Sequence, residues 1–452
     1  MRLNLTIKEL AEIIKGDLSA KDPSRIINNI SKDTRALSQG DVYWALKGAN
    51  FDGHDFIAEA AAKGAALAVA RAGAADLSGL NLALIEAPDT LAALQRLAKY
   101  HRLKHNLKIA AITGSNGKST TKQMLLAITS AAGKTAANIG NLNNHIGVPL
   151  SLLEIMPEDE FGVFELGASK KGDIDEIASL AVPDVAVLTN IAPAHLEFFG
   201  DMETIYRTKT EIIKSLSPGG TLIYNLDNDY LRRLKTDYKG KAISYGFSPD
   251  ADLIIDDKGD GFSFTYKDAR FSAPIRLQKH NKLNAAAACG AAIALGLFKE
   301  QIEKGLSSYT PMPLRLQEER RGNTKFILDY YNANPASMES ALDMLAASAA
   351  PHTAVLGDMM ELGKYSAKYH AQTAQKIIAL GIKNVLLAGP QMKAAYDILA
   401  AAKDIMVEYH KDKAALLPSL ERAAAAGGTV LIKASRGMGF EELYAVIASE
   451  TK

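Results

Sequence analysis

Residues 112–125, ITGSNGKSTTKQML, give the strongest indication of the fold. The apolar run KIAAIT leads into them, and glycines, a lysine and hydroxyl residues come before a helix-like segment. This order is typical of a phosphate-binding loop, in which backbone N–H groups and a helix dipole meet at one point. The loop is short, because Gly114 and Gly117 stand three positions apart, whereas the usual pattern places four residues between its glycines. A glycine turn without a ligand is the alternative.

The composition indicates an ordinary folded protein with substantial cores. Of 452 residues, 48% are hydrophobic and 23% are charged, and the net charge is +1. Without a basic excess, we expect no nucleic acid partner. No run approaches the roughly 18 apolar residues of a membrane span, and the N-terminus lacks the apolar core of a signal peptide. We therefore expect a cytoplasmic chain without membrane insertion, and a monomer. Cys289, the single cysteine, is expected to be a buried small hydrophobe.

Three compositional blocks predict an α/β chain of three domains. The first, residues 1–103, mixes short strands with helices, and its alanine-rich run 59–70 is expected to be helical. The second, residues 104–310, alternates apolar strands with amphipathic runs, which predicts a parallel sheet of the P-loop ATPase kind. Residues 252–277 add antiparallel strands through their period-two pattern. The third, residues 311–452, alternates again and predicts a Rossmann-like sheet without the GxGxxG fingerprint.

Polar residues follow the ends of three apolar strands. In the glycine loop, Lys118 can reach terminal phosphates and Ser119 can offer its hydroxyl to Mg²⁺. Glu165 ends the strand in VFELGA, and His195 follows the strand in VAVLTNIAPAH. Because ligands bind at the carboxyl ends of strands in open α/β sheets, both are candidate metal ligands. An ordinary strand-end glutamate and a structural histidine are the alternatives that the residues leave open.

The chain resembles the Mur ligases, ATP-dependent enzymes that form amide bonds in the peptide of bacterial cell-wall precursors. The central block carries GSNGKSTTK, GNLNNHIGVPLSLL, FELGA, TNIAPAHLEFFG, RTKTEI and HNKLNAAAA in the order of that family. The short loop is the family's form of the phosphate loop. The N-terminal SKDTRALSQGDVYWALKGANFDGH resembles a uridine-nucleotide-binding domain, and LDYYNANPASMESAL, LGDMMELG and KASRGMGFEE resemble the family's C-terminal domain.

The resemblance implies roles in ATP and metal binding. The residues matched to ATP are Gly114, Ser115, Asn116, Gly117, Lys118, Ser119 and Thr120 in the loop, Asn284 near adenine, and Arg315 and Asp329 from the C-terminal domain. The residues matched to Mg²⁺ are Ser119, Glu165, His195 and, if carbamylated, Lys209. Lys118, Lys209, His195 and Glu165 would be the catalytic residues. The helical pattern around Lys209, taken alone, favours a solvent-exposed ammonium instead.

The resemblance also implies two substrate sites. Thr34 and Arg35 match the nucleotide-sugar site. The residues matched to the incoming amine substrate are Asn332, Asn334, Ser435 and Arg436. An asparagine-rich stretch before a proline is also simply a good loop, and this alternative stays open.

Within the family, the D-x-YNANP and GDMMELG stretches resemble the members that join D-alanyl-D-alanine to UDP-N-acetylmuramoyl-tripeptide through an acyl phosphate. The resemblance therefore implies ATP, Mg²⁺ and these two substrates. The sister ligase that adds the third amino acid, lysine or diaminopimelate, is the rival, although its D-N-P-x motif is missing. A folate polyglutamylating enzyme is a weaker rival, and the N-terminal domain of the uridine-nucleotide-binding type argues against it. A nucleotide-binding scaffold that hydrolyses ATP without forming a bond is the rival from another class.

Overall fold

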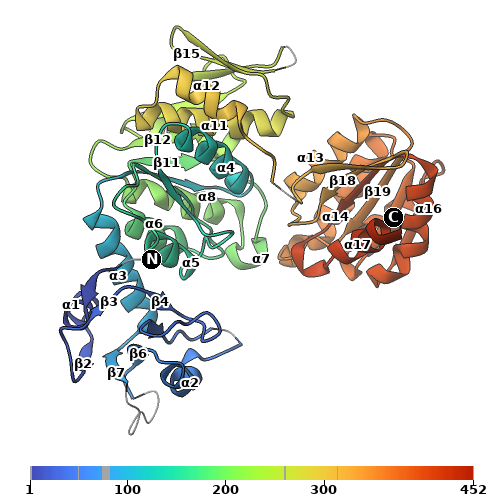
Figure 1. The fold of residues 1–452 in the computed structure, drawn as a ribbon. Helices are drawn as coiled ribbons and strands as arrows, with labels where there is room; N and C mark the ends of the chain where they lie inside the picture. Colours follow the sequence, from blue (N-terminus) through green and yellow to red (C-terminus); the bar gives the residue numbers. More distant parts are fainter. Residues whose placement is uncertain (1–2, 49, 74–81, 259–260, 313, 451–452) are drawn as a thin grey trace.

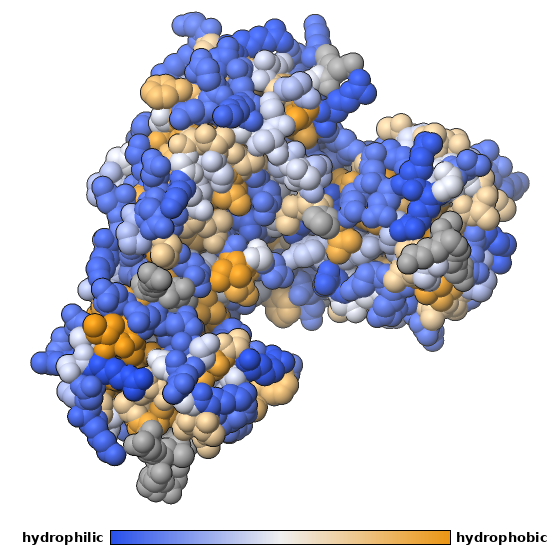
Figure 2. All heavy atoms as spheres, in the orientation of Figure 1, coloured by the Kyte–Doolittle hydropathy of each residue, from blue (hydrophilic) through white to orange (hydrophobic). Residues whose placement is uncertain are grey.

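The computed structural model describes residues 3–48, 50–73, 82–258, 261–312 and 314–450. Figure 1 shows three α/β bodies: the N-terminal body lies below the central one, and the C-terminal body lies beside it. The predicted α/β class is therefore confirmed. Hydrophilic residues predominate on the face drawn in Figure 2, and the outline is hollowed between the central and C-terminal bodies. Within the described ranges, no helix has the length and apolarity needed to cross a membrane.

The N-terminal body is built on a five-stranded sheet in the order β2-β7-β6-β5-β4, with a separate pair β1-β3. Its strands are β1 (Leu5–Thr6), β2 (Asp17–Ser19), β3 (Ile26–Ile27), β4 (Ile30–Ser31), β5 (Val42–Trp44), β6 (Leu67–Arg71) and β7 (Ala83–Ala87), and its helices are α1 (Ile7–Ile14), α2 (Ile57–Ala62) and α3 (Thr90–Lys104). Helix α3 contacts α1 on one side and α5 and α6 of the central body on the other. It therefore joins the two bodies.

The helical prediction for the alanine-rich run is wrong in its second half. Helix α2 ends at Ala62, and Gly64, at φ +85°, turns the chain away from the helix. The following Leu67–Arg71 form strand β6, which pairs in parallel with β5 and β7. Helix propensity is a weak local preference, and burial on both faces of a parallel sheet overrides it here.

The central body contains a nine-stranded sheet in the order β16-β15-β14-β13-β12-β11-β8-β10-β9. Its strands are β8 (Lys108–Thr113), β9 (Thr135–Ala137), β10 (Phe161–Glu165), β11 (Val185–Leu188), β12 (Thr221–Asn225), β13 (Ala242–Gly246), β14 (Leu253–Asp256), β15 (Phe262–Tyr266) and β16 (Ala269–Ala273). Its helices are α4 (Lys118–Ser130), α5 (Gly147–Leu152), α6 (Asp173–Ala181), α7 (Leu196–Phe199), α8 (Met202–Thr210), α9 (Asp229–Arg232), α10 (Leu234–Asp237), α11 (Lys279–Leu295) and α12 (Lys299–Ser307). In the order of the sheet from β9 to β14, each strand is parallel to its neighbour. Strand β15 pairs antiparallel with both β14 and β16, as the sequence predicts.

Strand β8 occupies the middle of this sheet, between β11 and β10, because its residues are apolar on both sides. Ile109 and Ala111 join the core that includes α6, whereas Ala110 and Ile112 join the core that includes α4 and α11. Cys289 lies fully buried within α11, as predicted, and burial raises the pKa of its thiol. The carboxyl end of β8 therefore delivers the glycine loop to the edge of the sheet where β10 and β11 also end.

The C-terminal body contains a six-stranded sheet in the order β17-β18-β22-β19-β20-β21. Its strands are β17 (Gln317–Arg321), β18 (Thr324–Asp329), β19 (His352–Gly357), β20 (Asn384–Ala388), β21 (Met406–His410) and β22 (Gly428–Lys433), and its helices are α13 (Pro335–Ala346), α14 (Ser366–Ala379), α15 (Lys393–Leu399), α16 (Leu417–Ala426) and α17 (Glu441–Glu450). All pairs are parallel except β17–β18. Segments after β18 and β19 contact the loops after β8 and β11, so strand ends of two sheets meet.

Candidate active site

The glycine loop after β8 has a backbone that only glycine adopts readily. Gly114 has φ +148° and Gly117 has φ +80°. A Cβ atom on Gly114 would lie 2.0 Å from Thr189 Oγ1, and one on Gly117 would lie 2.2 Å from Asn284 Oδ1. Both positions therefore require glycine for its conformation and for its lack of a side chain. Gly117 caps α4, so the loop presents N–H groups at a helix N-terminus.

The segment after β11 fixes the loop from the side. Ser115 N–H donates to the carbonyl of Asn190 at 2.9 Å, and Asn116 N–H donates to Asn190 Oδ1 at 2.9 Å. Thr189 Oγ1 donates to the carbonyl of Asn116 at 2.6 Å. These bonds hold the loop in one conformation before any ligand binds.

The predicted loop lysine, hydroxyl and carboxylate come together. Lys118 Nζ donates to the carbonyl of Gly114 at 2.8 Å, and burial lowers the pKa of Lys118 while Glu165 opposes that shift. Ser119 Oγ donates to Glu165 Oε2 at 2.7 Å. The other carboxylate oxygen, Oε1, accepts from Asn143 Nδ2 at 2.8 Å. Glu165 is buried, so the strand-end carboxylate belongs to the site and not to the solvent-exposed surface.

Lys209 contradicts the exposed-ammonium alternative. Its side chain at the end of α8 is 2% exposed, and Nζ donates to the carbonyl of Ala168 at 3.3 Å. Burial, with a further contribution from the positive charge of Lys118, lowers the pKa of Lys209 to about 7. The amine is therefore much easier to deprotonate than an ordinary lysine, whose pKa is about 10.4.

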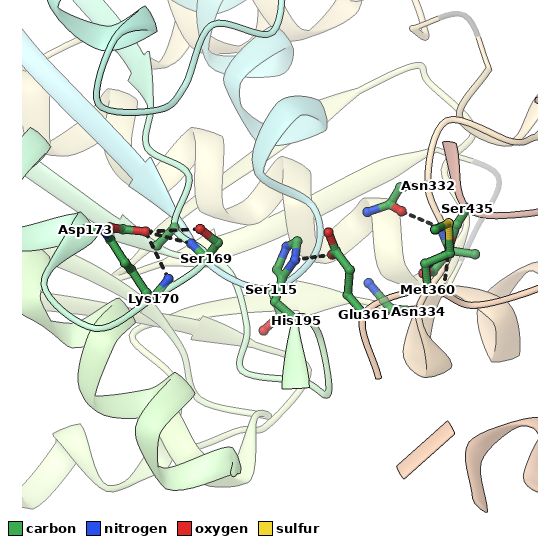
Figure 3. Close-up of polar contacts among 12 residues, drawn as sticks. Ser115, Ser169, Lys170, Asp173, His195, Asn332, Asn334, Met360, Glu361 and Ser435 are labelled. Atoms are coloured by element: carbon green, nitrogen blue, oxygen red, sulfur yellow. Dashed lines mark hydrogen bonds and ion pairs between the residues drawn. The ribbon is translucent and has the colours of Figure 1, made fainter. Parts of the chain in front are cut away.

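His195 pairs with a carboxylate from the other body. It stands at φ +54° before α7, and its Nδ1 lies 2.5 Å from Oε2 of Glu361, which follows β19. The imidazole lowers the pKa of Glu361 through this hydrogen bond. Figure 3 shows the two side chains pointing toward each other, with Asn334 and Met360 nearby.

The C-terminal body brings a second group of predicted residues to the loop. Arg315 Nη2 donates to Ser119 Oγ at 3.0 Å, and its guanidinium lies 4.1 Å from the ring centroid of Tyr331. Asn334 caps α13 and its Nδ2 donates to Asn116 Oδ1 at 2.5 Å. The two side-chain hydrogen bonds thus join the two bodies beside the phosphate loop, and the cation–π contact with Tyr331 orients Arg315 within the C-terminal body.

Asp329, at the end of β18, forms a buried ion pair. Lys433 Nζ donates to Asp329 Oδ2 at 2.5 Å and to the carbonyl of Asn332 at 3.1 Å. The Lys433 side chain is 1% exposed and that of Asp329 11%. Asn284, predicted near adenine, is buried on α11, and its Oδ1 accepts from Thr121 Oγ1 at 3.4 Å.

A cleft of about 1120 Å³ lies between the central and C-terminal bodies. The predicted residues that line it are Ser115, Asn116, Gly117, Lys118, Ser119, Thr120, Glu165, His195, Asn284, Arg315, Asp329, Asn332 and Asn334. Gly114, Lys209, Ser435 and Arg436 do not line it. Lys209 lies behind the cleft lining and is bonded to the cleft residue Ala168. Ser435 also lies behind the lining, and its Oγ accepts a hydrogen bond from the N–H of the cleft residue Met360 at 2.9 Å.

Two predicted residues lie elsewhere, in the N-terminal body. Thr34 is buried, and its carbonyl accepts from Lys63 Nζ at 2.9 Å. Arg35 is exposed and pairs with Asp33 at 2.6 Å. The structure therefore separates these two residues from the cleft.

Sequence reasoning missed several cleft residues: Asn143, Tyr331, Glu361 and Lys433. Each of them lies inside a motif that resembles the family, but the motif alone did not indicate what the residue contacts. The role depends on contacts between distant positions, since Glu361 is 166 residues from His195 and Lys433 is 104 from Asp329. The first pair forms where two bodies meet, and the second forms between the adjacent strands β18 and β22 of one sheet.

The oxygen donors in the cleft fit an Mg²⁺ ion that is bound by the protein and by a bound phosphate group together. Ser119 and Glu165 supply the oxygen donors that Mg²⁺ prefers. Among the described residues, no group of three or more His, Cys, Asp and Glu side chains is placed to hold a metal ion. Asn116 Nδ2 and Arg315 Nε are buried in the cleft without a partner in that part of the chain. Both features suit a phosphate ligand that completes the metal's coordination, as in many nucleotide sites.

A strand, a glycine loop and a helix that face a second Rossmann-like body define a P-loop nucleotide-binding protein. Models of three Mur ligase domains match the chain: the Mur ligase family catalytic domain at 26–102, the middle domain at 112–292 and the glutamate ligase domain at 314–436. The chain belongs to the Mur ligase family.

Similar proteins come from several bacteria. The UDP-N-acetylmuramoyl-tripeptide–D-alanyl-D-alanine ligase of Bacillus subtilis is 36% identical over 97% of both chains. The crystal structure of MurF from Acinetobacter baumannii matches with a TM-score of 0.90 and 32% identity over 98% of both chains. MurF ligase from Thermotoga maritima, solved in complex with ADP, matches with a TM-score of 0.83 and 28% identity over 94% of this chain and 97% of that one.

Proposed function

We propose that this chain is an ATP-dependent ligase that joins D-alanyl-D-alanine to UDP-N-acetylmuramoyl-tripeptide, releasing ADP and phosphate. The observation that carries the proposal is the phosphate loop, with the Ser119–Glu165 pair, facing a C-terminal body that reaches it through Arg315. Full-length relatives named for this reaction support the choice of substrates.

ATP binds with its phosphates on the loop Gly114–Thr120. The N–H groups at the start of α4 and the ammonium of Lys118 donate hydrogen bonds to the phosphate oxygens, since a helix N-terminus attracts anions. Asn284 lies beside the loop at Gly117, and we assign it to the adenine side. Arg315 and Asp329 enter from the C-terminal body, so nucleotide binding and the docking of that body reinforce each other.

Mg²⁺ would be held by Ser119 and Glu165 at one position, and by His195 and a carbamate on Lys209 at a second. Bound Mg²⁺ supplies positive charge beside the transferring phosphoryl group. The carbamate forms when the neutral amine of Lys209 takes up CO₂, which its pKa of about 7 allows near neutral pH. A carbamate is an anion and can bind a metal, whereas an ammonium cannot.

The reaction has two steps. The terminal carboxylate of the tripeptide attacks the γ-phosphorus of ATP, and the bond to the β-phosphate oxygen breaks, which gives an acyl phosphate and ADP. The amine of D-alanyl-D-alanine then attacks the acyl carbon, loses a proton and expels phosphate. Lys118 and Arg315 stabilise the charge that spreads over the phosphoryl oxygens. Closure of the bodies around the cleft keeps water away from the acyl phosphate.

The remaining assignments follow the same proposal. Thr34 and Arg35 bind the uridine nucleotide in the N-terminal body. The residues assigned to the dipeptide are Asn332, Asn334, Ser435 and Arg436. Asn334 fits this role because it stands at the cleft beside Asn116, whereas Ser435 acts from behind the cleft lining. We also propose a cytoplasmic monomer with domains 1–103, 104–310 and 311–452, a division supported by the three separate sheets.

The test is ATP-dependent phosphate release with UDP-N-acetylmuramoyl-tripeptide and one amine per tube: D-alanyl-D-alanine, D-alanine, lysine or diaminopimelate. Release only with the dipeptide supports the proposal. Parallel tubes contain UDP-N-acetylmuramoyl-dipeptide, and release there with lysine or diaminopimelate would assign the chain to the sister ligase. Release that ignores every amine would indicate a nucleotide hydrolase or scaffold. Lys118→Ala is expected to abolish turnover in the tube that works.

A further inference from the structure

The contact between His195 and Glu361 joins the two bodies at the cleft (Figure 3). His195 follows β11 of the central sheet, and Glu361 follows β19 of the C-terminal sheet. Their side chains meet at 2.5 Å between Nδ1 and Oε2. A carboxylate only accepts hydrogen bonds, so Nδ1 must carry the hydrogen. In the neutral ring, Nε2 then keeps its lone pair.

Backbone contacts show that this pairing is built and not incidental. Glu361 stands at φ +61°, a conformation that non-glycine residues adopt only under constraint. Its carbonyl accepts from the N–H of Glu197 at 3.0 Å. A few residues on, Tyr365 Oη donates to the carbonyl of Gly200 at 3.2 Å. The segment 361–365 thus docks along α7, the helix that begins directly after His195.

The segment is also fixed within its own body. Met359 N–H donates to Nε2 of the fully buried His370 at 3.0 Å, and Met360 N–H donates to Ser435 Oγ at 2.9 Å. The carbonyl of Asp358 accepts from Ser435 N–H at 3.2 Å. Three consecutive residues before Glu361 are therefore tied to α14 and to the end of β22. The carboxylate is presented from a rigid support.

We propose that Glu361 is a positioning residue, supplied by the C-terminal body, that fixes the ring orientation and the Nδ1–H tautomer of His195. Histidines that bind metals are usually held in this way, by a carboxylate or carbonyl on the nitrogen that does not bind the metal. Because the carboxylate comes from the second body, His195 is set for metal binding only while that body is docked. The metal-binding part of this inference rests on the proposed function, whereas the tautomer does not.

The direct test is ¹⁵N NMR of histidine-labelled enzyme without nucleotide, at about pH 8.5, well above the ordinary histidine pKa of about 6.5. The His195 signals are assigned by their loss in His195→Asn. We expect the Nδ1–H tautomer in the wild type and a shift to the Nε2–H form, which a free histidine side chain prefers, in Glu361→Ala. Glu361→Gln is expected to retain much of the Nδ1–H form, since an amide oxygen still accepts. An unchanged tautomer in Glu361→Ala would overturn the proposal.

The functional test is the Mg²⁺ dependence of dipeptide-dependent phosphate release. We expect Glu361→Ala to raise the half-maximal Mg²⁺ concentration about 10–100-fold, with Glu361→Gln in between. The KM for UDP-N-acetylmuramoyl-tripeptide and the thermal midpoint should stay unchanged. Glu339→Gln, an exposed carboxylate on α13 of the same body, is the matched control. An unaltered Mg²⁺ dependence in Glu361→Ala contradicts the metal-binding part. If wild-type release ignores the dipeptide, the proposed function fails, and the tautomer still decides the positioning role.

Discussion

Replacement of Gly117 by alanine tests whether the short loop is a built phosphate site. Gly117 has φ +80°, and the added methyl group would lie 2.2 Å from Asn284 Oδ1. Gly219, in the turn before β12, offers a matched control. It has nearly the same backbone, φ +79°, but a Cβ there would have no heavy atom within 4 Å. The two substitutions share the conformational strain and differ in the collision.

The magnitude follows from these two contributions. A left-handed conformation costs a non-glycine residue about 1–2 kcal/mol, and both variants incur that cost. In Gly117→Ala, Asn284 must also move, which breaks its bonds to Thr121 at 3.4 Å and to Asn281 at 3.1 Å. Each such bond contributes about 0.5–1.5 kcal/mol. The loop at Gly117 therefore loses about 2–5 kcal/mol, which corresponds to about a 30- to 4000-fold weaker nucleotide Kd at 1.4 kcal/mol per tenfold.

The assay is titration calorimetry with ADP and Mg²⁺. We expect Gly117→Ala to weaken binding by the stated factor, and Gly219→Ala to bind like the wild type while unfolding at a slightly lower temperature. Nucleotide affinity that is unchanged in Gly117→Ala, or equally reduced in Gly219→Ala, would show that the close contact at Gly117 does not shape the phosphate site.

Two further predictions concern buried lysines. Lys433→Met leaves the Asp329 carboxylate buried without its partner, which should destabilise the C-terminal body by about 3–5 kcal/mol and lower its thermal midpoint by about 5–15 °C. The control Lys393→Met removes an exposed ion pair and should cost at most about 1 kcal/mol. Equal thermal midpoints in the two variants would contradict this prediction. Burial lowers the pKa of Lys209 to about 7. Its amine is therefore neutral above that pH and protonated below it, so ¹³C NMR with labelled bicarbonate should show a carbamate that fades as the pH falls through about 7 and is absent in Lys209→Ala. No carbamate signal at pH 8 would contradict the role of Lys209.

The order of elements could be predicted wherever local pattern and tertiary packing agree. KIAAIT and VAVLT read as buried strands, and they became neighbours in one parallel sheet. The run EAAAKGAALAVA failed because alanine favours helices locally, whereas Leu67–Arg71 fill the space between two strands that are distant in sequence. The antiparallel strand β17 was missed for a related reason: its sequence, QEERR, is charged on both sides and carries little periodic signal.

The site could be predicted where a polar residue stands at the end of an apolar strand or directly after it. Lys118, Ser119 and Glu165 follow two strands whose ends are adjacent in the sheet, and they meet in the structure. The burial of Lys209 could not be read from its helix, because the surfaces that cover it belong to other segments, including Ala168. Glu361 was hidden for the same reason. Glu361 contacts His195 only because the second body docks against α7.

The origin of one phosphate oxygen shows whether the substrate carboxylate attacks ATP. UDP-N-acetylmuramoyl-tripeptide, labelled with ¹⁸O in its terminal carboxylate, is incubated with ATP, Mg²⁺, D-alanyl-D-alanine and the enzyme, and the released phosphate is examined by mass spectrometry. Amide formation through an acyl phosphate transfers one carboxylate oxygen to the phosphate, so we expect one ¹⁸O in each phosphate, together with a UDP-linked pentapeptide. Phosphate without ¹⁸O, made of three oxygens from ATP and one from water, would mean that water, and not the carboxylate, attacks ATP, and would rule out the acyl phosphate.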